Sequence, residues 1–376
     1  MDVHMKDSSV QNYYLGIEKQ FFRDFLVRAS YQGSMGHHLS QLMNLNRYDG
    51  MEYNANLSTS NPGRPNPLYS GFNYRANNLN SNFNSLVTEV QKRFSHGVQF
   101  QFSFTWSRLM DTGSDLFTGS TTSGGYSQPF YFLSNNYPKL EYGPGAFDHQ
   151  KNFKILFTYE LPFFKDQHGF LGHALGGWQL SGFYQGYSGH PIEVYSSRGR
   201  FRGNARDANG FLENIGGDYN LDGVANDHPD FVGSNASAAY SNASPADGIF
   251  KDNNLIGCGF PGAQSTNIQA CNDNYGVGTP NSLFTNPAGT GVHFGTLGRN
   301  LFRGPWFNGL DGSLLKNFKI TETVKMQFRF EALNLANHPN FDGIVTNLND
   351  GSFGKAQILI GNAPSRRLQM GVRITF

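Results

Sequence analysis

The feature that most constrains the fold is a strict two-residue alternation of apolar and polar side chains. The clearest stretch is residues 98–106, where every second residue is apolar: Val98, Phe100, Phe102, Phe104 and Trp106. Successive side chains of a β-strand point to opposite faces of the sheet. The pattern therefore predicts a strand with one apolar face and one wet face.

The same alternation recurs along the chain. It is strong at residues 153–161, 178–184, 324–332 and 368–376, and weaker at Leu15–Phe21, Phe25–Tyr31, Leu86–Phe94 and Leu310–Leu314. These stretches predict about nine strands, each near the ~9–11 residues that cross a bilayer when a strand is tilted.

Net charge of +1 argues against nucleic acid as a partner. Mean hydropathy of −0.46 excludes a helical membrane protein, and no run approaches the ~20 apolar residues of a spanning helix.

Two readings of alternating strands compete, a soluble β-sandwich and a transmembrane β-barrel. The polar faces carry Gln, Ser and Thr with interspersed charges, which is typical of a hydrated lumen. Aromatic residues stand at strand ends, where interfacial girdles belong: Trp106, Tyr159, Trp178 and Tyr184. We therefore predict an all-β, antiparallel transmembrane barrel segment that is incomplete. Five charged residues should face its lumen, for internal charge pairing and plug contact or for substrate contact: Glu89, Glu160, Arg329, Glu331 and Arg373.

The connections between the expected strands alternate between short and long. Short turns are expected at Arg23–Asp24, Ser95–Gly97 and Lys319–Glu322, with a longer turn at Pro162–Gly177. Long loops rich in Asn, Gly, Ser and Asp are expected at 33–81, 108–147, 190–305 and 336–366. Outer-membrane barrels combine short periplasmic turns with long extracellular loops. Residues 12–376 are then the barrel part, and residues 1–11, which lack an apolar signal core, are a disordered leader of a fragment.

One loop segment has the beginning of a calcium site. Oxygen-bearing residues Asp218, Asn220 and Asp222 precede Gly223 and the Val224 carbonyl at the spacing of an EF-hand loop. Pro229 stands where that loop needs a bidentate Glu, so the remaining ligands would be Asn226, Asp227, Asp230 or water. The alternative is an Asx-turn loop whose side chains bond their own backbone. No other cofactor is expected.

The remaining candidate residues are few. Cys258 and Cys271 are the only cysteines, and an even pair in an exported protein predicts a disulfide. The adjacent His37 and His38 are expected in a solvated loop rather than at a metal. No catalytic triad, phosphate-binding Gly loop or paired catalytic carboxylates stands out, so an enzyme is not expected.

Several blocks resemble a known family, the Oar-like TonB-dependent receptors abundant in acidobacteria, which carry a carboxypeptidase-regulatory-like domain. The blocks are KRFSHGVQFQFSFTWSRLMD, FTYELPFF, GGWQLSGFYQGYSGHPIEV, RNLFRGPWFNGLDGSLLKNFKI and FRFEALNLANHPNFDG. The final RRLQMGVRITF resembles the terminal signal read by the barrel-assembly machinery, with Phe376 as its last aromatic residue. The resemblance covers nearly all of residues 12–376 and implies a plugged barrel of about 22 strands. The family's signal peptide, TonB box, plug and earlier strands are not among these residues.

The resemblance implies an outer-membrane receptor that takes up an unknown ligand with energy from the TonB complex. Two alternatives remain. One is a passive porin or a surface export or adhesion barrel, and the other is a soluble secreted calcium-dependent binding module. The lumen-lining residues alone support only a passage or a plugged pore.

Overall fold

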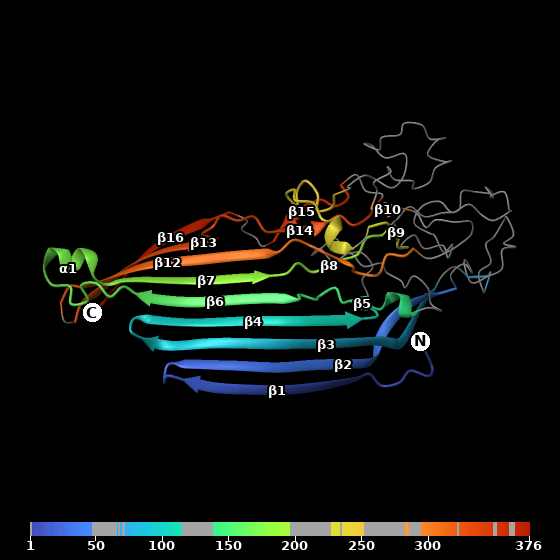
Figure 1. Cartoon of the computed structure of the whole chain (residues 1–376), viewed down its shortest axis with the longest axis horizontal. Helices are drawn as coiled ribbons and strands as arrows, with labels where there is room; N and C mark the ends of the chain where they lie inside the picture. Colours follow the sequence, from blue (N-terminus) through green and yellow to red (C-terminus); the bar gives the residue numbers. More distant parts are fainter. Residues whose placement is uncertain are drawn as a thin grey trace.

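The computed structural model describes residues 2–46, 66, 68–69, 72–114, 138–195, 227–233, 235–251, 283–285, 295–321, 323–348, 352–360 and 365–376. Its main element is one antiparallel sheet of long strands (Figure 1) in the order β1-β2-β3-β4-β6-β7-β12-β13-β16. The strands are β1 (Ser9–Phe21), β2 (Phe25–Leu45), β3 (Phe72–Ser95), β4 (Val98–Asp111), β6 (Lys151–Glu160), β7 (Trp178–Tyr187), β12 (Phe307–Lys319), β13 (Lys325–Leu333) and β16 (Arg367–Thr375). Each stretch of alternation lies in one of these strands, so the all-β antiparallel prediction is confirmed.

The register separates the side chains of this sheet into two faces. One row of paired residues is apolar from β2 to β12: Val27, Val90, Phe102, Ile155, Tyr184 and Leu310. The adjacent row is polar from β1 to β7: Glu18, Arg28, Glu89, Ser103, Lys154 and Gln185. We call the two sides the apolar face and the polar face. Arg329, Glu331 and Arg373 share the polar face, as expected.

No second sheet packs against the apolar face in the described part of the chain. Its side chains on the outer strands stand open, with Leu15 and Ile17 each 71% exposed and Val372 62% exposed. A sandwich would bury this face, because sheets that pack face to face interdigitate their side chains. Among the described residues, no helix is long and apolar enough to span a membrane.

The short turns all lie at one end of the sheet, which we call the turn end, and the long connections lie at the other, the loop end (Figure 1). Tight hairpin turns need left-handed backbone. Here Arg23 (φ 61°) and His96 (φ 53°) adopt it, together with Gly97 (φ 77°). The turn between β6 and β7 contains the α-helix α1 (Gly169–Leu175). A helix there was not predicted.

Strands at the loop end extend farther than expected. β2 continues to Leu45 and β3 begins at Phe72, so residues 33–45 and 72–81 of the loop expected at 33–81 lie in paired strands. The sequence missed it because backbone ladder bonds, rather than an apolar face, sustain these Asn- and Gly-rich parts. His37 lies in β2 beside a bulge, not in a loop as expected, and His38 there has φ 55°.

The amino-terminal residues are also placed differently from the expected leader. Asp2 N donates to Arg75 O at 2.8 Å, and Ser8 Oγ donates to His38 O at 2.5 Å. Asn77 donates to Lys6 O. Residues 2–8 therefore follow the β2–β3 hairpin, and β1 begins at Ser9 rather than after residue 11.

The loop end carries a layer of small elements with its own core. Two-residue and four-residue strands pair within it: β8 (Pro191–Ile192) with β11 (Phe302–Arg303), β9 (Asp230–Phe231) with β10 (Phe284–Thr285), and β14 (Phe341–Ile344) with β15 (Ala356–Leu359). The 3-10 helices η2 (Pro138–Glu141) and η3 (Ala236–Ala239) and the short strand β5 (Gly143–Pro144), paired with β4, complete it. We call these elements the loop-end layer. The loops expected at 190–305 and 336–366 thus contain ordered structure.

Four phenylalanines form the centre of the loop-end layer. Phe250, Phe284, Phe302 and Phe353 are at most 1% exposed, and their rings stack or meet edge to face. Such ring pairs contribute ~0.5–1.5 kcal/mol beyond the burial of their area. This cluster, rather than the sheet, is the main hydrophobic core of the described residues.

The sheet does not close on itself. Among the described strands, β1 pairs only with β2, and β16 pairs only with β13. Each therefore presents an edge of backbone groups, and lipid does not tolerate such edges. Further strands must pair with both edges wherever this sheet crosses a membrane.

Candidate functional site

A three-residue ion bridge crosses the polar face of the sheet. Arg28 on β2 donates to Glu18 on β1 at 2.6 Å and to Glu89 on β3 at 3.0 Å. All three side chains are partly exposed, so the bridge adds little stability in water. It does place alternating charges where a lumen would hold water, a plug or a passing ligand. Glu89 thus has the internal pairing that the sequence predicts.

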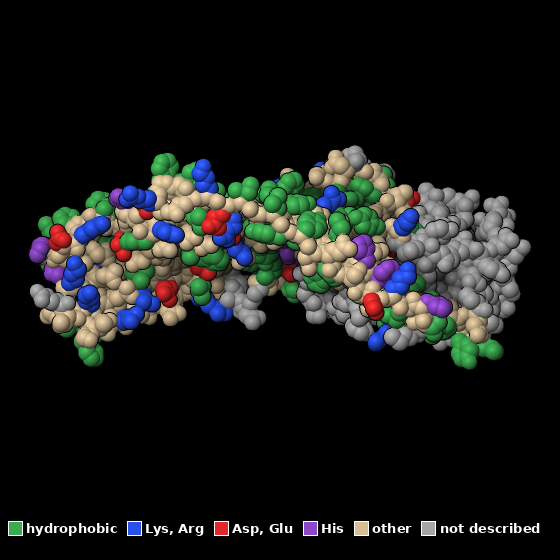
Figure 2. All heavy atoms as spheres, turned by 90° about the horizontal axis from the view of Figure 1, so that it is seen from below, with side chains coloured by type: hydrophobic (Ala, Val, Ile, Leu, Met, Phe, Trp, Pro, Cys, Tyr) green, Lys and Arg blue, Asp and Glu red, His purple; other side chains and the backbone are tan. Residues whose placement is uncertain are grey.

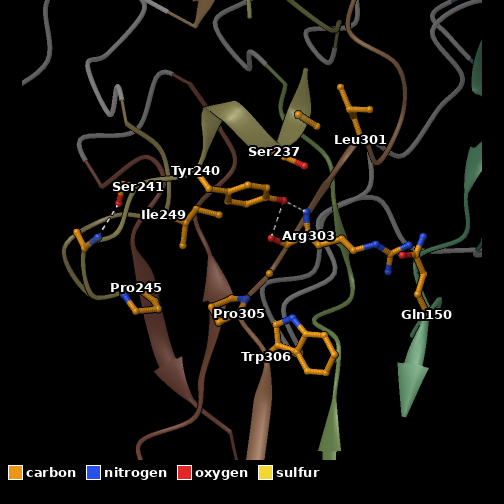
Figure 3. A pocket seen from close by; sticks show the side chains of 13 residues that line it. Gln150, Ser237, Tyr240, Ser241, Pro245, Ile249, Leu301, Arg303, Pro305 and Trp306 are labelled. Carbon is orange, nitrogen blue, oxygen red and sulfur yellow. Dashed lines mark hydrogen bonds between the residues drawn. The ribbon is translucent and has the colours of Figure 1, made fainter. Parts of the chain in front are cut away.

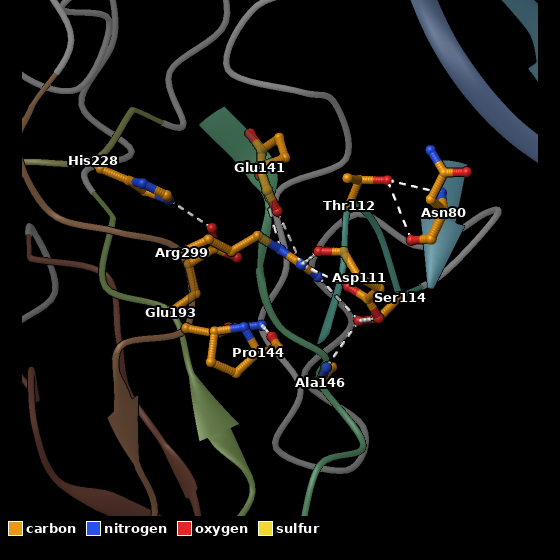
Figure 4. Close-up of polar contacts among 11 residues, drawn as sticks. Asn80, Asp111, Thr112, Ser114, Glu141, Pro144, Ala146, Glu193, His228 and Arg299 are labelled. Atoms are coloured by element: carbon orange, nitrogen blue, oxygen red, sulfur yellow. Dashed lines mark hydrogen bonds and ion pairs between the residues drawn. The ribbon is translucent and has the colours of Figure 1, made fainter. Parts of the chain in front are cut away.

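A buried arginine joins the end of the sheet to the loop-end layer (Figure 4). Arg299 donates to Asp111 Oδ1 at 2.6 Å and to Ser114 Oγ at 3.0 Å, and its Nε lies 3.8 Å from Glu141 Oε2. Asp111 is the last residue of β4 and Glu141 ends η2. Burial alone would lower the pKa of Arg299, but the charges of Asp111, Glu193 and Glu141 outweigh it and raise the pKa. The guanidinium therefore stays charged and fixes three segments to one another.

A second buried pair lies beside the first. His228 Nε2 is 2.6 Å from Glu193 Oε1, and His228 Nδ1 is 3.0 Å from the Leu297 carbonyl oxygen. Burial would lower the pKa of His228, but the hydrogen bond and the charge of Glu193 raise it above its ordinary value. Both side chains are at most 2% exposed. The pair links the residue after β8 to the segment that precedes β9.

A cavity of about 530 Å³ opens beside η3 (Figure 3). Tyr240 defines one wall, where its hydroxyl accepts from Arg303 N and donates to Arg303 O at 3.1 Å. Burial raises the pKa of Tyr240, and Arg303 partly offsets the effect. Arg303 also forms an ion pair with the buried Asp148. Trp306, 44% exposed, forms part of the mouth.

The chemistry that this cavity offers is binding. Its lining combines two aromatic side chains, aliphatic side chains, the hydroxyls of Ser237 and Ser241, and polar groups of Gln150 and Arg303. Small-molecule sites are typically about 300–1,000 Å³, apolar for the most part and with a few polar groups that orient the ligand. The cavity fits that description in size and composition.

Most site residues predicted from the sequence lie outside the described residues. This applies to Asp218, Asn220, Asp222, Val224 and Asn226 of the possible calcium loop and to Cys258 and Cys271. Asp227 is described and is 1% exposed. Within the described residues, no cluster of three or more His, Cys, Asp or Glu could hold a metal ion. Phe376 follows β16 at the turn end and is 96% exposed.

Sequence reasoning missed the buried charges of the loop end. Arg299 and Asp111 are 188 residues apart, and Glu193 and His228 are 35 apart. No local spacing connects such partners, so no motif could have indicated them.

Comparisons with known proteins identify a family and several similar solved structures. A family model described as an outer membrane beta barrel domain matches residues 1–369. Similar solved structures include the outer membrane transporter YddB from Escherichia coli, with 7% identity, a TM-score of 0.44 and coverage of 99% of this chain and 33% of that one. Another is the pyoverdine outer membrane receptor FpvA from Pseudomonas aeruginosa PAO1, with 10% identity, a TM-score of 0.39 and coverage of 99% and 30%.

A third is the FrpB iron transporter from Neisseria meningitidis, with 9% identity, a TM-score of 0.36 and coverage of 99% and 32%. The chain thus spans about a third of the length of these structures. No curated protein matches it in sequence.

Proposed function

This chain belongs to the family of outer membrane β-barrel domains, and we propose that it forms the C-terminal wall of a TonB-dependent receptor. Its location is the outer membrane, so the turn end is periplasmic and the loop end extracellular. In this proposal the whole receptor binds a ligand outside the cell and imports it with energy delivered through the TonB complex. The blocks quoted above, which resemble Oar-like receptors, support that subtype.

The observation that carries the proposal is that one face of the sheet is apolar and the other is polar and charged. The apolar face suits lipid, and the polar face carries the Glu18–Arg28–Glu89 bridge, a charged surface against which a plug can dock. The folded loop-end layer stands above it and offers a binding cavity. A passive pore needs the polar face but has no need for an ordered, cavity-bearing layer at its mouth.

Conductance of the intact protein in planar bilayers separates the receptor from a passive porin. A plugged receptor is expected to show no steady current without ligand, because its plug blocks the lumen. A permanently open channel would contradict the proposal. In cells, uptake of any ligand found by screening should stop when a protonophore removes the inner-membrane gradient, and uptake that persists would exclude energy coupling.

We further propose that the end of β16 is the assembly signal read by the barrel-assembly machinery. Leu368, Met370, Val372 and Ile374 alternate along β16, and Phe376 follows at the turn end. Deleting the last few residues of the intact protein should prevent its insertion in the outer membrane, measured by heat-modifiable migration of membrane fractions. Phe376→Tyr is the matched control, because it keeps an aromatic end and should insert normally.

A calcium site at Asp218–Asp227 and a Cys258–Cys271 disulfide remain proposals that rest on the sequence alone. Both would stiffen extracellular loops without changing the sheet. Mass measurement of the exported protein with and without reductant tests the disulfide, and two free thiols would refute it. Protection of the loop from protease by added calcium tests the metal site.

A further inference from the structure

The periplasmic turn between β6 and β7 presents an unusual amount of apolar surface. Five large side chains in residues 161–177 are open: Phe163 (61% exposed), Phe164 (53%), Phe170 (87%), Leu171 (63%) and Leu175 (50%). We call residues 161–177 the α1 turn. In the helix itself only Gly172 is buried, so α1 does not pack its apolar side chains on the sheet.

The α1 turn lies on the apolar-face side of the sheet. Lys316 of β12 shares that face with Trp178 and Leu314, and its Nζ donates to the Ala174 carbonyl oxygen at 3.1 Å and to that of Gly176. Trp178 Nε1 donates to the same Ala174 oxygen at 3.1 Å. The C-terminal end of α1 is therefore held against the side of the sheet that meets lipid.

Lys316 is unusual among residues of the apolar face. Its side chain is 3% exposed, and Nζ lies 5.0 Å from the ring centres of both Trp178 and Phe318. Aromatic ring faces and the carbonyls at a helix C-terminus are both groups that attract a cation. The α1 turn thus covers a charge that would otherwise face lipid, and the charge in return holds the helix.

A side-chain amide fastens the segment just before the N-terminus of α1. Gln167 Nε2 donates to Asn317 O at 2.8 Å, and Lys319 N donates to Gln167 Oε1 at 3.1 Å. These backbone groups lie just beyond the last residue pair of β7 and β12, Lys316 and Trp178. Gln167 therefore extends the ladder of hydrogen bonds along β12 past Trp178, the first residue of β7. A seven-residue helix is too short to be stable alone, so these contacts define its position.

We propose that the α1 turn is a membrane foot, which inserts its apolar side chains among the phospholipids of the periplasmic leaflet. Two observations identify lipid as the partner. The α1 turn is hydrogen-bonded to Lys316 and Trp178 of the apolar face, and it lies at the turn end, where that face leaves the bilayer (Figure 1). Lys165 adds a positive charge within the turn itself. Figure 2 shows Lys and Arg side chains, together with Asp, Glu and His, around this end of the molecule.

The arrangement matches the physics of an interfacial helix. Such helices lie in the plane of the membrane with apolar residues about 5–10 Å into the headgroup and acyl boundary. Phe170 and Leu171 supply the apolar part, while headgroup phosphates would complement Lys165. The foot would fix the depth and tilt of the β6–β12 wall, since it connects β6 to β7, is bonded to β12 and cannot follow these strands deeper without leaving the interface.

Spin-label accessibility in the intact protein tests the foot. Phe170→Cys is made in a background of Cys258→Ser and Cys271→Ser, labelled, and reconstituted in nanodiscs of phosphatidylethanolamine and phosphatidylglycerol. Collisions with lipid-soluble oxygen are compared with collisions with a water-soluble nickel chelate. The oxygen-to-nickel ratio at position 170 should approach that of Val372→Cys on the apolar face and exceed that of Leu68→Cys severalfold.

Leu68 is the matched control because it is 86% exposed, as much as Phe170, but lies at the loop end. If the ratio at position 170 equals that at position 68, the foot is in water and the proposal is wrong. Lys316→Met keeps an unbranched side chain of similar length and removes the charge that holds the helix. It should increase the mobility of the label at position 170 while the barrel stays heat-modifiable, and unchanged mobility would refute the role of Lys316.

Discussion

The sheet and the loop-end layer are stabilised in opposite ways. Phenylalanines of the sheet, such as Phe102, are only half-buried, whereas Phe250 in the loop-end layer is fully enclosed by other rings. The sheet is stabilised by hydrogen bonds between the backbones of its strands and by contact of its two faces with lipid and with lumen water. The loop-end layer has a hydrophobic core and buried ion pairs, as a soluble domain has. One chain therefore contains a part that needs a membrane and a part that needs water.

Phe250→Ala should give the largest difference in stability between the loop-end layer and the sheet. Removing a fully buried phenylalanine costs about 3–5 kcal/mol through lost burial and the cavity that remains. The loop-end layer should become susceptible to protease while strand content, measured by circular dichroism, stays unchanged. Phe102→Ala is the control and should leave both properties close to those of the unmodified protein, because lipid fills the space.

Arg299→Met tests the junction between the two parts. It leaves Asp111 and Glu141 buried without their cation, and such a loss costs about 3–5 kcal/mol. Hydrogen exchange should speed up in the loop-end layer and at the end of β4, but not at the turn end. Faster exchange along the whole sheet would mean that the two parts form one cooperative unit.

Phe102→Arg tests whether the apolar face meets lipid. A charged residue near mid-bilayer costs about 2–4 kcal/mol, which reversible urea unfolding from lipid vesicles can measure. Gln101→Arg is the matched control on the polar face, and it should unfold like the unmodified protein because water hydrates it. Equal effects at the two positions would contradict the assignment of the faces.

The stability of the loop-end layer should depend on pH through His228. Its pKa is raised in the folded protein above the unfolded value of 6.5. The pair with Glu193 therefore contributes fully below that value, and the contribution is lost as pH rises through the folded pKa. Proteolysis of the layer should increase over that interval, and His228→Gln should abolish the pH dependence. The sheet serves as the internal control, since it should not respond.

Arg28→Ala should have the smallest effect on stability. The bridge to Glu18 and Glu89 is partly exposed, and such pairs contribute about 0–1 kcal/mol. Urea unfolding should change little. If the polar face contacts a plug, however, the conductance of the intact protein should rise. If the protein still passes no current, the plug contacts the barrel elsewhere.

The sequence predicted the strands of the sheet well but not the contacts of the loop-end layer, for a physical reason. Alternation is a local property, so residues 98–106 indicated β4, and the other periodic stretches indicated their strands. Residues 33–45 and 72–85 lack it, and the continuation of β2 and β3 went unpredicted. The contacts of Phe250, Arg299 and His228 join distant segments without any periodic pattern. The α1 helix was missed because seven residues carry too little periodicity.

The β2–β3 hairpin is longer than the thickness of the membrane requires. Twenty-one residues of β2 correspond to a strand of about 70 Å at about 3.3 Å per residue. A tilt of about 45° leaves roughly 50 Å of height, about twice the ~25 Å apolar band of an outer-membrane barrel. On the proposed orientation, the upper half of the hairpin therefore projects beyond the apolar band on the extracellular side.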